Sequence, residues 1–197
     1  MSIIRRAVMV VDIRSSTSIL EDLKQTDNLA RWRNLLIGLK EFVIDRRSAI
    51  GVEPYKFVGD GWILLFPENI SKTEFTEFLT DFSTQFDMSF DGNISGFLQR
   101  RPAQIGLTFG VDSGELVQLE MNENIEYLGR AINVAARLQD AAKRIEHADS
   151  YQALFSNNSF NTMASPHDHQ IRVRSVSVSL KNVANGDRYE CLAYCPL

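Results

Sequence analysis

The sequence is poor in the features that mark secreted, membrane and zinc-binding proteins. Its only two cysteines, Cys191 and Cys195, lie close together and lack the second pair that a zinc site needs. No stretch approaches the roughly 20 apolar residues of a membrane span, and the apolar run from Ala7 to Val11 is followed at once by Asp12. We therefore expect two free thiols, no signal peptide and a cytoplasmic protein.

Positive charge is also scarce. A formal net charge of −4 predicts no basic surface for nucleic acid or for an anionic membrane. The histidines His147, His167 and His169 form no convincing metal site, since the last two flank Asp168 in a polar loop. The chain does contain 44% hydrophobic and 23% charged residues, as expected of a globular protein with one core. We expect a single domain over residues 1–197.

The hydrophobic pattern predicts alternating strands and helices. Short apolar segments predict strands at residues 7–13, 55–58, 62–66, 103–111, 152–155, 171–180 and 188–194. Apolar residues at three- and four-residue spacing predict helices at residues 29–44, 72–88 and 130–145. A glycine-containing loop is expected at residues 90–101, and a turn at 112–114. Because hairpins outnumber crossover units, we expect an α+β sandwich with a mostly antiparallel sheet and flanking helices.

Two aspartates are predicted to stand where strands end. Asp12 closes the first apolar run, and Asp60 lies between Gly59 and Gly61 at the tip of a predicted hairpin. Magnesium needs only one or two protein carboxylates beside substrate phosphates, so this pair suffices for a metal–nucleotide site. Two ordinary turn aspartates are the alternative, and an Asp-Gly pair alone favours it.

Asn133 and Arg137 are four residues apart on a predicted helix and therefore share one face. A guanidinium in that position can bind a phosphate through two parallel hydrogen bonds. Taken without other observations, the pair is more simply interpreted as a solvated helix face.

These segments resemble, in type and in order, the class III adenylyl and guanylyl cyclase family. Residues 11–13 (Val-Asp-Ile) with Thr17 are similar to its first metal motif, and residues 56–60 to its Lys-x-x-Gly-Asp hairpin. Residues 110–115 resemble the strand and turn before its dimerisation arm, and residues 129–138 resemble its Gly-x-x-Val-Asn-x-Ala-x-Arg signature. Residues 179–182 match a late Leu-Lys-Gly strand less closely. The resemblance covers nearly the whole chain, so we expect no appended regulatory domain.

The resemblance implies a ferredoxin-like cyclase sandwich that forms a 3′,5′-cyclic nucleotide and pyrophosphate with two Mg²⁺ or Mn²⁺ ions. Asp12, the carbonyl of Ile13 and Asp60 would hold the metals. The family works as a head-to-tail homodimer, in which the metal aspartates of a site and its Asn/Arg pair come from different protomers.

The remaining site residues follow from the same resemblance. Asn133 would orient the ribose, and Arg137 would stabilise charge that develops on the α-phosphate. Lys181 would neutralise the β- and γ-phosphates. Lys56 would read the base in one site while Asp60 serves the other, so the hairpin that carries both should lie at the dimer interface.

Two positions depart from the family pattern. Ser15 and Ser16 replace a usual Gly-Phe before Thr17, although backbone amides at a helix start still favour a phosphate there. The acid expected to read the base beside Lys56 is Glu126, one methylene longer than aspartate. With uracil, Lys56 would donate to a carbonyl oxygen and Glu126 would accept from the ring N–H.

Aromatic residues near Lys56 and Glu126 could pack against a pyrimidine, which is smaller than a purine. Tyr55, Phe57 or Tyr127 could fill the space of a missing ring, but strand alternation points Tyr55 and Phe57 away from Lys56 and favours core packing for both. The motif at residues 12–17, Asp-Ile-Arg-Ser-Ser-Thr, and the small format look most like the pyrimidine cyclases of bacterial Pycsar antiphage systems. Such an enzyme makes a second messenger, cyclic UMP favoured over cyclic CMP, which a separate effector protein reads.

Two alternatives stay open. An adenylate cyclase that converts ATP to cyclic AMP is the first, because Lys56 is kept. A degenerate domain that binds a nucleotide or a partner without turnover is the second. Retention of Asp12, Asp60, Asn133 and Arg137 together argues against that second alternative.

Overall fold

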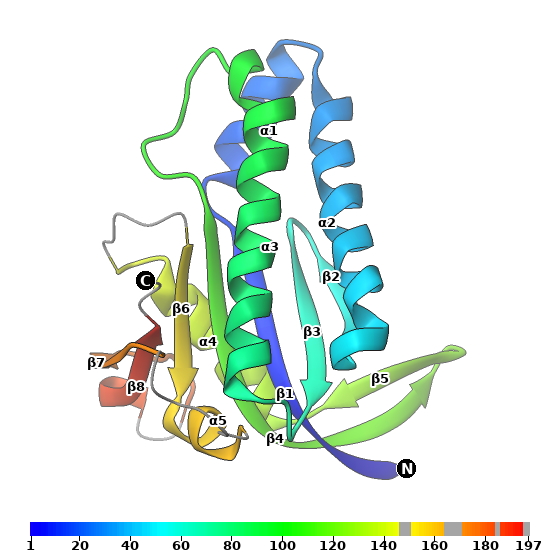
Figure 1. Cartoon of the computed structure of the whole chain (residues 1–197), viewed down its shortest axis with the longest axis vertical. Coiled ribbons are helices and arrows are strands. Elements are labelled where there is room, and N and C mark those ends of the chain that lie inside the picture. Colours follow the sequence, from blue (N-terminus) through cyan, green and yellow to red (C-terminus); the bar gives the residue numbers. More distant parts are fainter. Residues whose placement is uncertain (146–150, 164–170, 184–185, 195–197) are drawn as a thin grey trace.

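The fold is built on one eight-stranded sheet, seen in the computed structural model, which describes residues 1–145, 151–163, 171–183 and 186–194 (Figure 1). The strand order is β2-β3-β1-β4-β6-β8-β7, with β5 paired to β4 outside that path. The strands are β1 (Ser2–Ile13), β2 (Glu53–Val58), β3 (Gly61–Pro67), β4 (Leu107–Met121), β5 (Asn124–Leu128), β6 (Tyr151–Ser156), β7 (Val173–Val178) and β8 (Tyr189–Tyr194). Every pairing is antiparallel except β4 with β6, so the predicted α+β class and mostly antiparallel sheet are confirmed.

Helices flank both faces of this sheet. They are α1 (Ser16–Gln25), α2 (Leu29–Ile50), α3 (Lys72–Asn93), α4 (Arg130–Ala142) and α5 (Asn157–Thr162), with short 3₁₀ turns η1 (Ser95–Phe97) and η3 (Gly186–Arg188). In Figure 1, α2 and α3 lie in front of the sheet and α4 lies behind it. Within the described residues, each helix is too short or too polar to cross a lipid bilayer.

Side-chain alternation along β1 divides the core between the two faces. Met9 and Val11 pack with α2 and α3, whereas Val8 packs with Ala131 and Ala135 of α4. The same period of two places the side chain of Asp12 on the α4 face. The location of the first candidate metal ligand is therefore set by the strand that also fills the core.

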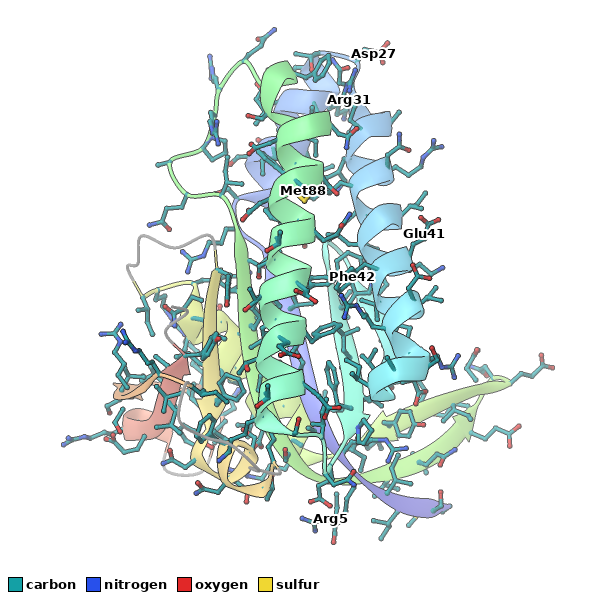
Figure 2. The ribbon with its side chains drawn as sticks, in the orientation of Figure 1. Arg5, Asp27, Arg31, Glu41, Phe42 and Met88 are labelled. Carbon is teal, nitrogen blue, oxygen red and sulfur yellow. The ribbon has the colours of Figure 1, made fainter. Side chains whose placement is uncertain are left out.

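The core between the sheet and α2 and α3 is rich in phenylalanine. Phe42 of α2 lies between the two helices (Figure 2), and its ring centroid is 5.8 Å from that of Phe78 and 5.7 Å from that of Phe82. Such tilted and edge-on contacts are the favoured arrangement of aromatic rings. This packing holds the two 22-residue helices together along much of their length.

Several predicted boundaries were wrong. The turn expected at residues 112–114 lies inside β4, because β1 pairs with this segment through Val8↔Asp112 and Ala7↔Ser113. The strand expected at 103–111 begins at Leu107, and α3 continues to Asn93 into the expected loop. Helix α2 runs to Ile50, and α4 ends at Ala142. The histidines and Cys195 lie outside the described residues.

The remaining cysteine is chemically quiet. Cys191 is a free thiol in β8 that is only 1% exposed, and burial raises its pKa to about 12. A thiol with so little thiolate at neutral pH is a poor nucleophile. Its role is to fill the core.

Candidate active site

The end of β1 and the tip of the β2–β3 hairpin bring Asp12 and Asp60 together. Gly61 makes this approach possible, because a Cβ at that position would lie 2.0 Å from the carbonyl oxygen of Val11. Gly59 has a φ of 71°, a left-handed conformation that glycine adopts without steric cost. The two glycines that predicted a hairpin tip thus also set the distance between the two carboxylates.

The electrostatics of the two carboxylates suit a divalent cation. Burial raises the pKa of Asp12, the charge of Asp60 raises it further, and Lys143 opposes both effects. The Oδ2 atom of Asp60 is buried and has no hydrogen-bond partner among the described residues. Two neighbouring carboxylates with such an orphaned oxygen fit a site for Mg²⁺ or Mn²⁺. No further histidine, cysteine or acid within the described chain completes a larger cluster with them.

A pocket of about 320 Å³ opens beside this pair. Its lining consists of Ile13, Arg14, Ser15, Ser16, Thr17, Gln104 and Lys143. Ser15 precedes α1 with a φ of 57° and directs its hydroxyl to the carbonyl of Gln104 at 2.7 Å rather than to the helix. The first turn of α1 contains no acidic residue and receives no side-chain cap. The residues of this turn border a pocket whose lining contains no carboxylate, an arrangement that favours an anion such as phosphate.

Arg14 reinforces the positive potential of this pocket. The residue is 6% exposed, and its guanidinium donates to Gln104 Oε1 at 2.9 Å and to the carbonyl of Ala142 at 2.9 Å. Both acceptors are neutral, and Arg14 Nε has no partner among the residues described here. Burial lowers the pKa of Arg14, but an arginine remains charged at neutral pH. Its contact with Ala142 also fixes the end of α4.

Helix α4 lies unusually close to the sheet. A Cβ at Gly110 of β4 would stand 2.1 Å from the carbonyl oxygen of Ala135, so only glycine permits this approach. Gln139 Nε2 donates to Thr108 Oγ1 at 2.7 Å, and Thr108 Oγ1 is 3.3 Å from the carbonyl oxygen of Asp12. A buried polar chain thus connects α4 to the backbone of the candidate metal ligand.

The opposite side of α4 is exposed and carries Asn133 and Arg137. Neither side chain has a hydrogen bond or an ion pair within the described part of the chain. Lys181 is also exposed, and its neighbour Leu180 packs against Val134 in the cluster beneath α4. Within the described residues, none of the three forms a hydrogen bond or an ion pair with Asp12 or Asp60.

The two residues expected to read a base do meet. Lys56 Nζ lies 2.9 Å from Glu126 Oε2 and 3.1 Å from Oε1. The hydroxyl of Tyr55 donates to Glu126 Oε2 and accepts from the backbone N–H of Tyr127 at 2.9 Å. The hydrogen bond from Tyr55 and the one from Lys56 lower the pKa of Glu126, which therefore stays an acceptor.

Core packing, the role favoured for Tyr55 and Phe57, describes neither fully: Tyr55 packs at the edge of the core but also binds Glu126. The register of β2 against β3 shifts between Pro54 and Lys56, so simple alternation fails there and the Tyr55 hydroxyl reaches Glu126. Phe57 is 52% exposed and packs on Trp62 with ring centroids 5.2 Å apart. A bulge is a pairing irregularity that the residue types of this segment did not indicate.

Sequence reasoning also missed two cations. Arg14 lies within the motif at residues 12–17, but it was assigned no role, and its burial was not predicted. Lys143, six residues after Arg137, forms an ion pair with Asp12. No local pattern pointed to that contact, which depends on where α4 ends above β1.

The described surface has a larger hollow beside Lys56. This groove of about 520 Å³ is lined mainly by apolar side chains of α2, β2 and β3: Leu29, Trp32, Arg33, Leu36, Ile37, Lys40, Pro54, Lys56, Phe57 and Trp62. The β4–β5 ribbon projects from the body on the right of Figure 1 and carries the exposed residues Met121, Ile125 and Leu128. Exposed apolar surfaces of this kind are typical of protein interfaces.

Comparisons with known proteins support the fold. No protein-family model and no curated protein matches the sequence. The adenylyl cyclase CyaB from P. aeruginosa is similar in structure, with a TM-score of 0.73 and 15% identity over 100% of this chain and 97% of that chain. The guanylyl cyclase Cya2 has a TM-score of 0.72 and 16% identity over 100% of this chain and 94% of that one.

A third similar structure is a class III adenylyl cyclase-like ATP-binding protein from Pseudomonas aeruginosa. Its TM-score is 0.62 at 17% identity, and the match covers 82% of this chain and 35% of that chain. Sequence identities this low establish a shared fold and leave the chemistry to the residues of the site.

Proposed function

We propose that this chain, whose fold is that of the class III adenylyl and guanylyl cyclase domains, is itself a nucleotide cyclase. The observation that carries the proposal is the approach of Asp12 and Asp60 with an orphaned, buried oxygen on Asp60. Asp12, Asp60 and the carbonyl of Ile13 would hold two divalent ions. Bound there, the ions would lower the pKa of the ribose 3′-hydroxyl and neutralise the triphosphate.

The residues of the chain supply the rest of the site. Ser15, Ser16 and Thr17 would bind phosphates at the start of α1. Neither the first turn of this helix nor the lining of the pocket contains an acidic residue that would repel them. Arg137 would stabilise charge on the α-phosphate, and Asn133 would orient the ribose. These contacts act on the transition state by fixed electrostatics rather than by covalent chemistry. Lys181 would meet the terminal phosphates.

The proposed active form is a head-to-tail homodimer with two shared sites. Asn133 and Arg137 are exposed and unpaired in the described chain, and a second copy would bring them to Asp12 and Asp60. The apolar ribbon and the apolar groove beside Lys56 would be covered in the same assembly.

We propose a pyrimidine nucleotide as substrate, with UTP favoured over CTP. Lys56 is a donor and Glu126 an ionised acceptor, which suits a uracil carbonyl next to its ring N–H. The Tyr55 ring stands beside this pair, with the Lys56 Nζ 5.8 Å from its centroid, and would favour a small base. The resemblance to Pycsar cyclases extends the proposal to a second messenger in antiphage defence, read by a separate effector protein.

Two other functions have specific support. The Lys56–Glu126 pair also suits the edge of adenine, and the similar CyaB is an adenylyl cyclase. The second is nucleotide binding without turnover, and one protein of similar structure is described as an adenylyl cyclase-like ATP-binding protein.

The substrate is tested by incubating the protein with Mn²⁺ and each of the four nucleoside triphosphates in turn. We expect cyclic UMP as the main product, with less cyclic CMP, measured by mass spectrometry. Cyclic AMP as the sole product would overturn the pyrimidine assignment. Absence of any cyclic product, with nucleotide binding retained, would identify a binding domain and overturn the cyclase proposal.

Replacing Tyr55 with phenylalanine tests its part in base recognition. Loss of the hydroxyl removes one hydrogen bond from Glu126, so we expect kcat/KM for the pyrimidine substrate to fall about tenfold, as for one hydrogen bond to a charged group. Discrimination against ATP should fall with it. Tyr127→Phe is the matched control, because the Tyr127 hydroxyl has no hydrogen bond among the described residues. Equal kinetics of the two variants would exclude Tyr55 from base recognition.

A further inference from the structure

The ammonium of Lys143 lies against one of the two candidate metal ligands. It forms an ion pair with Asp12 Oδ2, on the carboxylate that lies beside Asp60. Two neighbouring carboxylates repel each other when no cation lies between them. In this structure, a cation of the chain itself supplies the compensating charge.

The backbone that carries Lys143 is fixed on several sides. The Arg14 guanidinium holds the carbonyl of Ala142 at 2.9 Å, and Gln139 is bound to Thr108 at 2.7 Å. The Lys143 side chain is 41% exposed and ends in a flexible four-carbon stem. Its ammonium can therefore change partners without movement of α4.

A second partner is available within reach of the same side chain. Lys143 lines the pocket of about 320 Å³ at the start of α1, together with residues 13–17 and Gln104. No carboxylate lines this pocket, and Arg14 stands in it with a charge that no described acid neutralises. An anion in the pocket would attract the ammonium as strongly as Asp12 does.

We infer that Lys143 exchanges partners during substrate binding: it neutralises Asp12 in the metal-free protein and binds the triphosphate once a divalent ion takes Asp12. Lys143 is thereby a substrate-binding residue that also keeps the metal site closed to an ion without nucleotide. The inference rests on the proposed function, since it takes a metal–triphosphate complex as the ligand. It predicts that loss of the Lys143 charge strengthens the binding of a divalent ion without nucleotide and weakens the binding of a triphosphate.

The test compares the wild type, Lys143→Met and Lys143→Arg, with Lys24→Met as a matched loss of one exposed lysine on α1. Mn²⁺ binding without nucleotide is followed by electron paramagnetic resonance of the free ion. We expect Lys143→Met to bind Mn²⁺ about threefold more tightly, the strength of a half-exposed ion pair. With Mn²⁺ saturating, calorimetry should show tripolyphosphate bound about tenfold more weakly by Lys143→Met. Lys143→Arg should bind tripolyphosphate as the wild type does.

The outcomes are separable. An unchanged affinity for either ligand in a folded Lys143→Met, or weaker Mn²⁺ binding by that variant, would overturn the exchange. Circular dichroism of each variant checks folding, and Lys143→Gln, which also removes the positive charge, replaces Lys143→Met in both titrations if the methionine variant unfolds. Neither titration requires turnover. If Lys143→Met shows both opposite shifts but the wild type forms no cyclic nucleotide, the proposed function is overturned and the exchange stands.

Discussion

Replacing Asp60 with asparagine is expected to reduce cyclase activity by about 10³-fold while leaving the fold intact. The Oδ2 atom of Asp60 is buried without a hydrogen-bond partner in the described chain, and the negative charges of Asp60 and Asp12 repel each other. Asparagine keeps the shape and removes the charge, so the free energy of unfolding should not fall. Turnover is measured by product formation with Mn²⁺, and stability by thermal unfolding followed by circular dichroism.

The control for this substitution is Asp81→Asn. Asp81 forms an exposed ion pair with Arg46 at 2.7 Å on the outside of the paired helices, where such pairs contribute little to stability. Its loss should leave turnover unchanged. A variant Asp60→Asn that kept a tenth or more of the wild-type rate would exclude Asp60 as a metal ligand.

Mixing two inactive variants is expected to restore activity. In the proposed homodimer, each site takes Asp12 and Asp60 from one protomer and Arg137 from the other. A protomer with Asp60→Asn therefore damages the site to which it supplies the aspartates, and a protomer with Arg137→Ala damages the site to which it supplies the arginine. A hybrid of the two therefore has one site with both defects and one site with none. Because random pairing makes half of the dimers hybrids, activity should return to about a quarter of the wild-type level.

The decisive control is a mixture of Asp60→Asn with Asp12→Asn. Both residues serve the metal side of a site, so each site of this hybrid keeps one defect and no recovery is expected. Hybrids are isolated by two different affinity tags, which shows that subunits have exchanged. Captured hybrids of Asp60→Asn and Arg137→Ala without activity would overturn the shared-site assembly.

Local chemistry made part of the candidate site predictable. An apolar, β-branched run that ends in Asp12 is typical of a buried strand with a carboxylate at its edge, and two glycines around Asp60 favour a hairpin turn. The spacing of Asn133 and Arg137 placed both on one side of a helix. Each of these predictions needed only neighbouring residues.

Other features depended on pairing between distant segments. The residues 112–114 have turn propensity, yet β4 continues through them because β1 supplies hydrogen bonds along that stretch. A register shift in β2 turned Tyr55 toward Glu126, against the alternation that its sequence predicted. Backbone hydrogen bonding outweighed local preference in both cases.

The sequence by itself thus determined the two candidate metal ligands and the Asn133–Arg137 face, because glycine conformations, strand alternation and helical spacing act over a few residues. Only the tertiary structure decided that Lys143 lies on Asp12. That contact requires α4 to approach β4 at Gly110, and the length of α4 then carries Lys143 to the end of β1. Contacts between groups far apart in the chain are fixed by the packing of whole elements, which no short pattern encodes.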